Sequence, residues 1–412
     1  LAELENDLEF LRFIQSDEIN NVEQFVMTLA SYHPSGQTAF VDEVNKAFAL
    51  LTEGDHFQHF FTDRDGTLKS YSCSYPTSIQ PAYSAVIQVL LNLVLLGYPK
   101  LCMSIINLLR IFVKNRNLQA QFARRCAQFC AIVTTSPLMH IGVLNVSTMP
   151  EGYYAYGASA GREWYLNPSL QFKDDSVNDA DLALLTSVFE RLEELLEQPE
   201  YRNFTWIGSG LQRHYGHITI ARQDVNYSVP KHRSSLLYQA VCKIVNEVDP
   251  MATTLTLREG EFDLKIFTKV ALSEVNSATV IFDLLIESSF LLTALYMAKI
   301  SGRIFNKGHG IRLIKSKMGL KLNCGKILVC GDSETDLPML EECLLCSPTN
   351  VYTIWVTTNP QLQEKVRSLC GTYENDHYVF VSCPEVLLGA MANATVREIT
   401  IRPQGDDDED EE

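Results

Sequence analysis

The chain has 412 residues, of which 46% are hydrophobic and 20% are charged, as is typical of a globular protein long enough for more than one domain. Its formal net charge of −16 argues against nucleic acid as a partner, because a protein that binds a phosphate backbone needs a basic surface. Of the 11 cysteines, only Cys343 and Cys346 form a C-x-x-C pair, and no histidine cluster follows it. With no visible signal peptide, this pattern predicts free thiols and a cytoplasmic location.

The residues before Gly54 are predicted to form helices, with a turn at residues 33–36. Apolar side chains recur there at helical spacing in three groups: Leu8, Leu11 and Ile14; Val22, Val26 and Leu29; Phe40, Val44, Phe48 and Leu51. We interpret residues 1–54 as an N-terminal helical segment. It serves as a structural appendage or a surface for self-association in this interpretation, rather than as part of a catalytic site.

Four apolar runs beyond Gly54 are predicted to be buried strands, and a loop and a helical pattern follow each of them. They cover residues 56–62, 126–133, 326–330 and 351–356. Repeated strand–loop–helix units favour a parallel α/β sheet, whose ligands bind at the carboxyl ends of the strands. We assign residues 55–146 and 300–404 to this sheet core, and residues 405–412 to a disordered acidic tail.

The region between the second and third strands has a different sequence pattern, which predicts amphipathic helices and short strands in succession. Helices are expected at residues 181–196 and 234–248, and strands at 204–207, 217–222, 253–258 and 261–269. We therefore expect an α+β module, inserted into the sheet domain over residues 147–299.

Two carboxylates follow the first predicted strand, in the sequence Thr62-Asp63-Arg64-Asp65. In extended backbone, residues two apart point the same way. Asp63 can then attack a phosphorus atom, and Asp65 can protonate the leaving alcohol and later activate water. A bound Mg²⁺ would neutralise the phosphate in such a reaction. The alternative is purely structural, with Asp65 capping the start of a helix.

Three further segments carry groups that suit this chemistry, each beside a predicted strand or helix. Asp332 and Asp336 follow the third strand and can complete an all-oxygen Mg²⁺ site. Thr134 is the first polar residue after the second strand, where its hydroxyl can bind phosphoryl oxygens. Lys307 precedes a helical pattern and can offset the negative charge of the nucleophile and the phosphate.

These elements, in the order D-x-D-x-T, threonine, lysine and G-D-x-x-x-D, resemble the haloacid-dehalogenase phosphatase superfamily. The first and last elements are specific, whereas the threonine and the lysine are not specific alone. The resemblance implies a Rossmannoid parallel-sheet core, with the inserted module as an α/β cap of the C2B type that seats the substrate.

A closer resemblance, from about Glu53 to Arg402, is to the nematode form of the trehalose-6-phosphate phosphatases. It is carried by the strings FTDRDGTLKSYSCSYPTSIQPAYS, QAQFARRCAQFCAIVTTSPL, GLQRHYGHITIARQ, EGEFDLKI, FNKGHGIRL and GDSETDLPML. It implies release of phosphate from trehalose 6-phosphate, with Asp63 as nucleophile and Asp65 as acid and base. Asp63, Asp332 and the backbone carbonyl of Asp65 would bind Mg²⁺, with Asp336 in or beside that shell.

The resemblance also suggests four cap residues that would bind the sugar. Arg213 and Arg222 flank a strand pair that is similar to the family's K…HyR segment, and Glu261 and Lys265 lie in a later cap strand. Each of these side chains can equally be a solvated strand residue. The implied partner is a small sugar phosphate, and neither nucleic acid nor a membrane is expected.

Two apolar segments, residues 89–119 and 270–301, depart from the family pattern. They are extra helices on the core, membrane-seeking segments, or non-native translated sequence such as a retained intron, with the third interpretation preferred. Residues 86–96 are apolar but reach only about half of the ~20 residues that a membrane span needs. Two rival functions therefore stay open: a phosphatase for another sugar phosphate, and a non-catalytic isoform disabled by these segments.

Overall fold

The computed structural model describes residues 22–54, 56–71, 127–139, 142–147, 154–224, 226–269 and 305–401. Four features of the sequence interpretation lie outside these residues. They are the first N-terminal helix around Leu8, the two extra segments at 89–119 and 270–301, and the acidic tail at 405–412.

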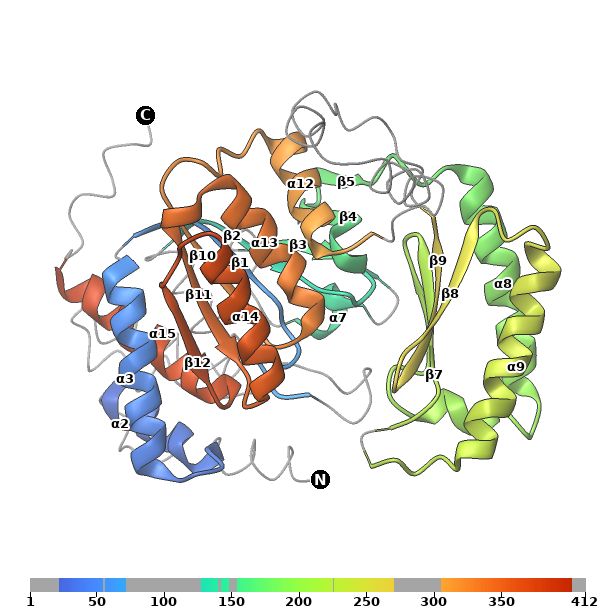
Figure 1. Ribbon diagram of the computed structural model, residues 1–412, viewed down its shortest axis with the longest axis horizontal. Helices are drawn as coiled ribbons and strands as arrows, with labels where there is room; N and C mark the ends of the chain where they lie inside the picture. The colour runs from blue at the N-terminus through green and yellow to red at the C-terminus, as the bar shows by residue number, and fades with distance from the viewer. Residues whose placement is uncertain are drawn as a thin grey trace, which may run out of the picture.

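One large sheet forms the centre of the catalytic core (Figure 1). Its eight strands have the spatial order β12-β11-β10-β1-β2-β3-β4-β5. The neighbours from β12 to β3 are parallel, and β4 and β5 extend the sheet as antiparallel strands. The strands are β1 (Phe57–Thr62), β2 (Ala127–Val133), β3 (Ala155–Ala158), β4 (Glu163–Asn167), β5 (Leu170–Lys173), β10 (Lys326–Gly331), β11 (Val351–Val356) and β12 (Tyr378–Val381).

The parallel α/β core predicted from the sequence is confirmed, and the four predicted strands correspond to β1, β2, β10 and β11. The core and the inserted module divide at a different place from the expected residue 147. Strands β3, β4 and β5 belong to the large sheet, so the inserted module begins after Lys173.

Helices cover both faces of this sheet, as alternate side chains of each strand require. Phe60 and Leu328 belong to one hydrophobic cluster, whereas their neighbours Phe61 and Val329 belong to the other. The first cluster includes residues of α2 (Val22–Leu29), α3 (Gln37–Gly54) and α15 (Pro384–Ile401). The second includes residues of α12 (Lys307–Met318), α13 (Leu337–Cys346) and α14 (Pro360–Thr372). Figure 1 shows these two helical layers on opposite sides of the strands.

The described N-terminal helices are part of the core rather than an appendage. Phe40 and Val44 of α3 are buried and lie close to Gly389 of α15. Glu43 of the same helix accepts hydrogen bonds from the backbone N–H and the hydroxyl of Ser382, at 2.7 and 2.9 Å. The helices therefore complete one hydrophobic layer of the catalytic core, and their expected role in self-association stays a prediction.

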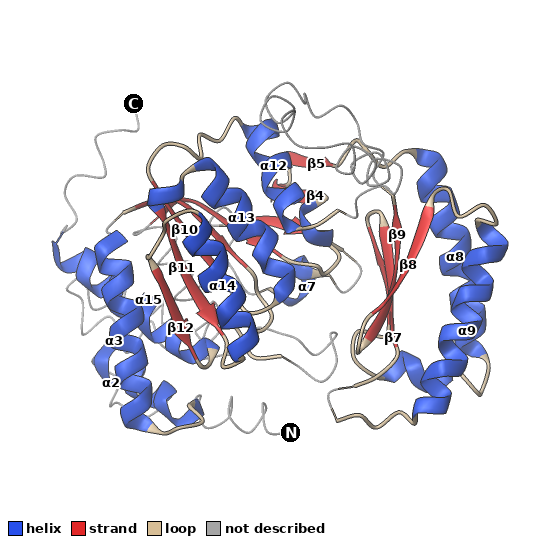
Figure 2. Ribbon diagram, viewed as in Figure 1, coloured by secondary structure: helices blue, strands red, loops and turns tan. Residues whose placement is uncertain are grey.

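The inserted module forms a second body beside the core (Figure 2). Its antiparallel sheet has the order β6-β7-β9-β8, with β6 (Leu211–His214), β7 (His217–Ala221), β8 (Leu255–Glu259) and β9 (Asp263–Thr268). Helices α8 (Asp179–Glu197) and α9 (Lys231–Val248) pack on one face of this sheet and share its hydrophobic cluster. The strand expected at residues 204–207 is wrong, because Arg202–Trp206 is a 3₁₀ helix.

Candidate active site

The carboxyl ends of three neighbouring strands bring the predicted catalytic segments together. Strand β1 lies between β10 and β2, with Thr62 opposite Cys330 on one side and Ile132 on the other. Asp63 therefore leaves the sheet beside the loops that carry Asp332 and Thr134. Its backbone N–H donates to the carbonyl of Cys330 at 3.0 Å, which fixes the start of the loop.

Lys307, the first residue of α12, is the cation that contacts Asp63. Its Nζ lies 2.9 Å from Oδ1 of Asp63 and 2.5 Å from Oδ1 of Asp336. The Lys307 side chain is 1% exposed and that of Asp336 is completely buried. Burial lowers the pKa of Lys307, but the charges of Asp336 and Asp63 outweigh burial and raise that pKa above its ordinary value. The amine therefore stays protonated.

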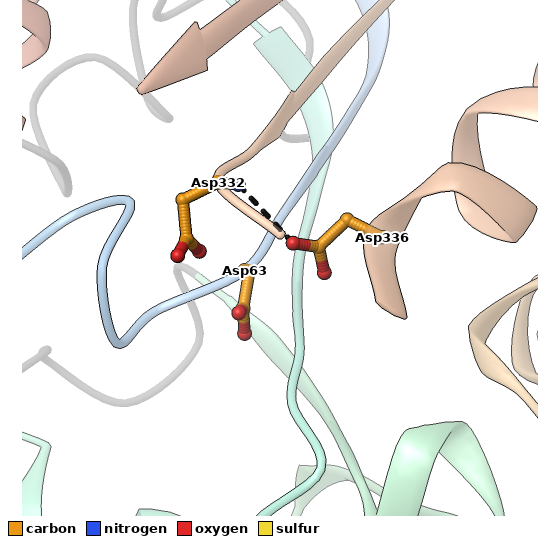
Figure 3. A group of neighbouring side chains, drawn as sticks. All are labelled: Asp63, Asp332 and Asp336. Atoms are coloured by element: carbon orange, nitrogen blue, oxygen red, sulfur yellow. Dashed lines mark hydrogen bonds between the residues drawn. The ribbon is translucent and has the colours of Figure 1, made fainter. Parts of the chain in front are cut away.

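The loop after β10 is organised around the other oxygen of Asp336. This Oδ2 atom accepts hydrogen bonds from the backbone N–H groups of Asp332 and Ser333, at 3.1 and 3.0 Å, and from the Ser333 hydroxyl at 3.0 Å. Figure 3 shows the first of these contacts, together with the side chains of Asp63, Asp332 and Asp336. Both oxygens of Asp336 are thus engaged, one by Lys307 and one by the loop.

Two side chains from the loop after β1 hold Asp332. The hydroxyl of Thr67 donates to its Oδ1 at 3.0 Å, and the hydroxyl of Tyr71 donates to its Oδ2 at 2.7 Å. Gly66, which precedes Thr67, has φ +91°, and a Cβ atom there would overlap the Asp332 carboxylate. A glycine is required at this position, because the backbone must approach the carboxylate closely.

The three carboxylates fit a divalent cation. Within the described residues, Asp63, Asp332 and Asp336 are a group in which one carboxylate oxygen of each lies within 4.8 Å of the others. Burial raises the pKa of Asp63 to about 7, with Lys307 opposing this rise and the charge of Asp336 adding to it. Burial and the charges of Asp336 and Asp63 also raise the pKa of Asp332 well above its ordinary value. The single charge of Lys307 therefore does not balance the negative charges of the three carboxylates. A hard cation that prefers oxygen ligands, such as Mg²⁺, would balance them.

The second carboxylate of the D-x-D sequence has different partners. Nη1 of Arg64 contacts both oxygens of Asp65, at 2.9 and 3.0 Å, and Nζ of Lys69 lies 3.8 Å from one of them. The group of three carboxylates does not include Asp65. The predicted nucleophile thus contacts Lys307, whereas the predicted acid and base contacts Arg64 and Lys69.

Thr134 is buried at the end of β2 and is tied to the neighbouring loops. Its backbone N–H donates to Gly157, and its carbonyl accepts from Ala160. The hydroxyl accepts a hydrogen bond from the backbone N–H of Ser136 at 3.2 Å. The next residue, Thr135, lines the cleft described below. A role of Thr134 in phosphate binding stays a prediction.

A cleft of about 730 Å³ lies between the core and the inserted module. Lys307 lines it from the core, and Lys265 of β9 lines it from the module. Its other charged lining residues carry both signs, namely Arg162, Arg258, Glu259, Asp263, Arg312, Glu334 and Glu341. Such a wall of mixed donors and acceptors suits a hydroxyl-rich ligand with a phosphate group.

Arg162 joins the core to the module at one end of this cleft. Its Nη1 atom donates to the carbonyl of Gly216 at 3.2 Å and to the hydroxyl of Thr268 at 2.9 Å. Its Nε atom lies 3.5 Å from Asp174, and its guanidinium lies over the ring of Phe305. A Cβ atom at residue 216 would overlap Nη1, so the contact depends on a glycine there.

Of the four cap residues expected to bind sugar, the structure places Lys265 in the cleft lining. All four have partners in the module itself, and Nζ of Lys265 lies 3.3 Å from Asp263. Arg213 donates to the Thr186 hydroxyl at 2.6 Å, Arg222 donates to the Ser234 hydroxyl at 2.8 Å, and Glu261 accepts from the Tyr227 hydroxyl.

Sequence reasoning did not single out Arg64, Thr67, Tyr71 or Arg162. Thr67 had a signal, because it completes the D-x-D-x-T sequence. Arg64 stands between the two predicted catalytic aspartates, but its pairing with one of them is a matter of side-chain geometry. Tyr71 and Arg162 act on residues far away in the chain, which no local pattern predicts.

With this geometry established, comparison with known proteins gives the family. The model of the family "Trehalose-6-phosphate phosphatase, C-terminal" matches residues 60–92 and 113–387. The chain belongs to this family. The match omits residues 93–112, which lie inside the first extra segment, and it runs through the second one.

Curated relatives divide into two groups. The chain is 52% identical over 400 residues to "Alpha,alpha-trehalose-phosphate synthase [UDP-forming] 1" of Caenorhabditis briggsae, covering 97% of this chain and 25% of that protein. It is 29% identical over 408 residues to "Trehalose-phosphatase" of Brugia malayi, covering 94% of this chain and 70% of that protein. The chain thus spans about a quarter of the length of its more similar relative.

Among solved structures, the C-terminal domain of trehalose-6-phosphate phosphatase from C. albicans is 12% identical, with a TM-score of 0.45. The alignment covers 86% of this chain and 96% of that one.

Within the part of this chain that the structure describes, no helix is both long and apolar enough to cross a bilayer. The cysteines described there are free thiols.

Proposed function

We propose that the chain is a Mg²⁺-dependent phosphatase that hydrolyses trehalose 6-phosphate to trehalose and phosphate, with a cytoplasmic location. One observation carries the proposal: three carboxylates and a buried lysine converge where neighbouring parallel strands end, beside a cleft with charged walls. Membership of the trehalose-6-phosphate phosphatase family supports the choice of substrate.

In the first step, an oxygen of Asp63 attacks phosphorus and the bond from phosphorus to the sugar oxygen breaks. Asp65 gives its proton to that oxygen, so free trehalose leaves and a phosphoryl group remains on Asp63. Lys307, 2.9 Å from Asp63, holds this carboxylate in place and offsets the charge of the phosphate. In the second step, water loses a proton to Asp65 and attacks phosphorus, and the bond to Asp63 breaks to release phosphate.

Asp63, Asp332 and the backbone carbonyl of Asp65 would hold the Mg²⁺, which would polarise the phosphate and shield its charge from the nucleophile. Thr67 and Tyr71 orient the Asp332 carboxylate by hydrogen bonds to its two oxygens. Asp336 would act beside this shell, because its Oδ1 is paired with the Lys307 ammonium and its Oδ2 accepts from three donors of the loop after β10, whereas each oxygen of Asp332 accepts from a single hydroxyl.

We propose that the inserted module is a cap of the C2B type. The sugar would occupy the cleft between this module and the core. Lys265, Arg258 and Asp263 line that cleft and offer donors and acceptors for hydroxyl groups. Arg213, Arg222 and Glu261 would support the cap through the partners that they have within it.

Phosphate release by the purified protein tests the proposal, with trehalose 6-phosphate compared against glucose 6-phosphate and sucrose 6-phosphate, with and without Mg²⁺. We expect Mg²⁺-dependent release, a preference for trehalose 6-phosphate in kcat/KM, and no release by Asp63→Asn. A preference for another sugar phosphate would keep the chemistry and reject the substrate.

A folded wild-type protein that releases no phosphate from any of these esters would instead favour the non-catalytic isoform. A variant without residues 89–119 separates the causes in that case. Activity gained by this deletion would assign the defect to the extra segment, whereas an inactive deletion variant would reject the proposed reaction.

A further inference from the structure

Arg64, between the two aspartates of the D-x-D sequence, has contacts that the proposed reaction does not yet explain. Its side chain is 2% exposed, which is rare for an arginine without a specific partner. Its Nη1 atom contacts both oxygens of Asp65, and its Nη2 atom donates to the carbonyl of Val146 at 3.1 Å. The guanidinium is thus held at one end by the core and presents its other end to Asp65.

The backbone around Asp65 is already fixed, so its side-chain orientation is the freedom that remains. The backbone N–H of Gly66 donates to the carbonyl of Lys69 at 2.7 Å, and those of Leu68 and Lys69 donate to the carbonyl of Arg64. These bonds close a tight turn. Within this turn, the contacts with the side chains of Arg64 and Lys69 set where the Asp65 carboxylate points.

The orientation of Asp65 matters because the site holds more carboxylates than a metal ion needs. Oxygens of Asp63, Asp332 and Asp336 lie within 4.8 Å of one another, and Asp65 is outside that group. A carboxylate that moved toward a bound cation would be lost for proton transfer. The contact with Arg64 keeps the Asp65 side chain apart from the group.

We propose that Arg64 is a positioning residue for Asp65: anchored on Val146, it holds the Asp65 carboxylate where that group can exchange a proton with the leaving sugar oxygen. The inference rests on the proposed function. It predicts a defect in one part of the reaction, namely proton donation to the leaving group, while attack by Asp63 is preserved.

Substrates with different leaving groups distinguish proton donation by Asp65 from attack by Asp63. An alkoxide leaving from a sugar phosphate needs a proton, whereas p-nitrophenolate is stable enough to leave without one. The ratio kcat/KM covers the steps up to departure of the leaving group, so it does not depend on later hydrolysis of the phosphorylated Asp63. We would therefore measure kcat/KM for trehalose 6-phosphate and for p-nitrophenyl phosphate, at saturating Mg²⁺, with wild type, Arg64→Met, Arg64→Lys and Asp65→Asn.

For Arg64→Met, kcat/KM for trehalose 6-phosphate should fall by about tenfold or more, and by no more than the about 10²- to 10⁴-fold that general acid catalysis supplies in full. Its kcat/KM for p-nitrophenyl phosphate should stay within about threefold of wild type. Asp65→Asn should show the same selectivity more strongly. Arg64→Lys should recover part of the loss, because a lysine keeps the charge but has no second nitrogen to bind Val146.

An equal loss on both substrates would overturn the inference and assign Arg64 a merely structural role, and no loss on either would overturn it as well. Melting temperatures check that the variants fold, and Arg64→Lys carries the same comparison if Arg64→Met does not fold. A wild type that hydrolyses p-nitrophenyl phosphate but not trehalose 6-phosphate rejects only the substrate, and the test then uses the sugar phosphate that it does hydrolyse. A wild type inactive on both rejects the proposed function and this inference together.

Discussion

At the scale of single residues, the site depends on charges that are buried next to one another. Lys307 and Asp336 are almost completely inaccessible to water, and their shared contact is 2.5 Å long. A buried charge without a partner is costly, so each member of such a pair is needed by the other. Asp336 also stabilises the loop that carries Asp332, because its other oxygen accepts a hydrogen bond from the backbone N–H of Asp332.

Replacement of Asp336 by alanine should therefore lower the free energy of unfolding by about 3–5 kcal/mol, the usual cost of breaking a buried ion pair. Urea denaturation would measure this change. Lys365→Ala is the matched control, because Lys365 and Glu334 form an ion pair at 2.5 Å in which both side chains are at least half exposed. The control should cost less than about 1 kcal/mol. Equal losses for the two variants would contradict the account of a buried charged cluster.

At the scale of elements, the connection from α9 to β8 shows how one carboxylate can join a helix to a strand. Asp249 follows the last residue of α9 and accepts hydrogen bonds from the backbone N–H groups of Thr254 and Leu255, at 2.9 and 2.7 Å. Burial raises the pKa of Asp249, but these hydrogen bonds, with those from Thr253, outweigh burial and hold that pKa below its ordinary value.

A folded-state pKa below the unfolded one means that the ionised carboxylate stabilises the fold above the unfolded pKa, and that this contribution is lost as the pH falls through the folded pKa. Asp249→Asn should therefore cost about 1–2 kcal/mol near neutral pH. The difference from wild type should shrink below pH about 4, the ordinary range of an aspartate. Unfolding free energies at several pH values test this, and a difference that grows toward acidic pH would contradict the assigned cause.

The helices and strands differ in how well the sequence alone predicts them. Residues 351–356 were predicted as a strand with the bounds of β11, because a continuous apolar run is typical of a strand buried on both faces. The hairpin of β4 and β5 was missed, since its residues are mostly exposed or half-buried and give no such run. Residues 204–207 were predicted as a strand, but the segment Arg202–Trp206 forms a 3₁₀ helix in which only Phe204 is buried.

Among the residues of the site, those next to a recognisable strand could be predicted, and those that act through distant contacts could not. Asp63 and Asp332 could be predicted, because each directly follows a buried parallel strand. Tyr71 could not, because its hydroxyl contacts Asp332 across 261 positions of sequence. The role of Arg162 also depends on distant contacts, with Gly216 and Thr268 of the inserted module.

At the scale of the whole molecule, the described N-terminal helices and the catalytic strands share one hydrophobic cluster. Phe40 of α3 is completely buried in this cluster. Trp164 and Trp355 are buried in the cluster on the opposite face of the same sheet. A core of this kind should unfold as one unit, with the N-terminal helices included.

Phe40→Ala should therefore destabilise the core by about 3–5 kcal/mol and shift the transition seen by the tryptophans on the other face. Trp206, the third tryptophan and 74% exposed, would first be replaced by phenylalanine, so that fluorescence reports only the core. Asn45→Ala on the exposed side of α3 is the control and should shift the transition little. An unchanged tryptophan transition in Phe40→Ala would restore the interpretation of these helices as an appendage.

Capture of the phosphorylated enzyme tests the central claim, Asp63 as nucleophile, most directly. Asp65→Asn would be mixed with p-nitrophenyl phosphate and Mg²⁺, quenched in acid, digested and analysed by mass spectrometry. Because this substrate needs no proton to leave, while hydrolysis of the intermediate lacks its base, a phosphoryl group should accumulate on the peptide with Asp63. The same peptide should stay unmodified in Asp63→Asn. Release of p-nitrophenolate with the phosphoryl group on another residue, or on none, would contradict the account.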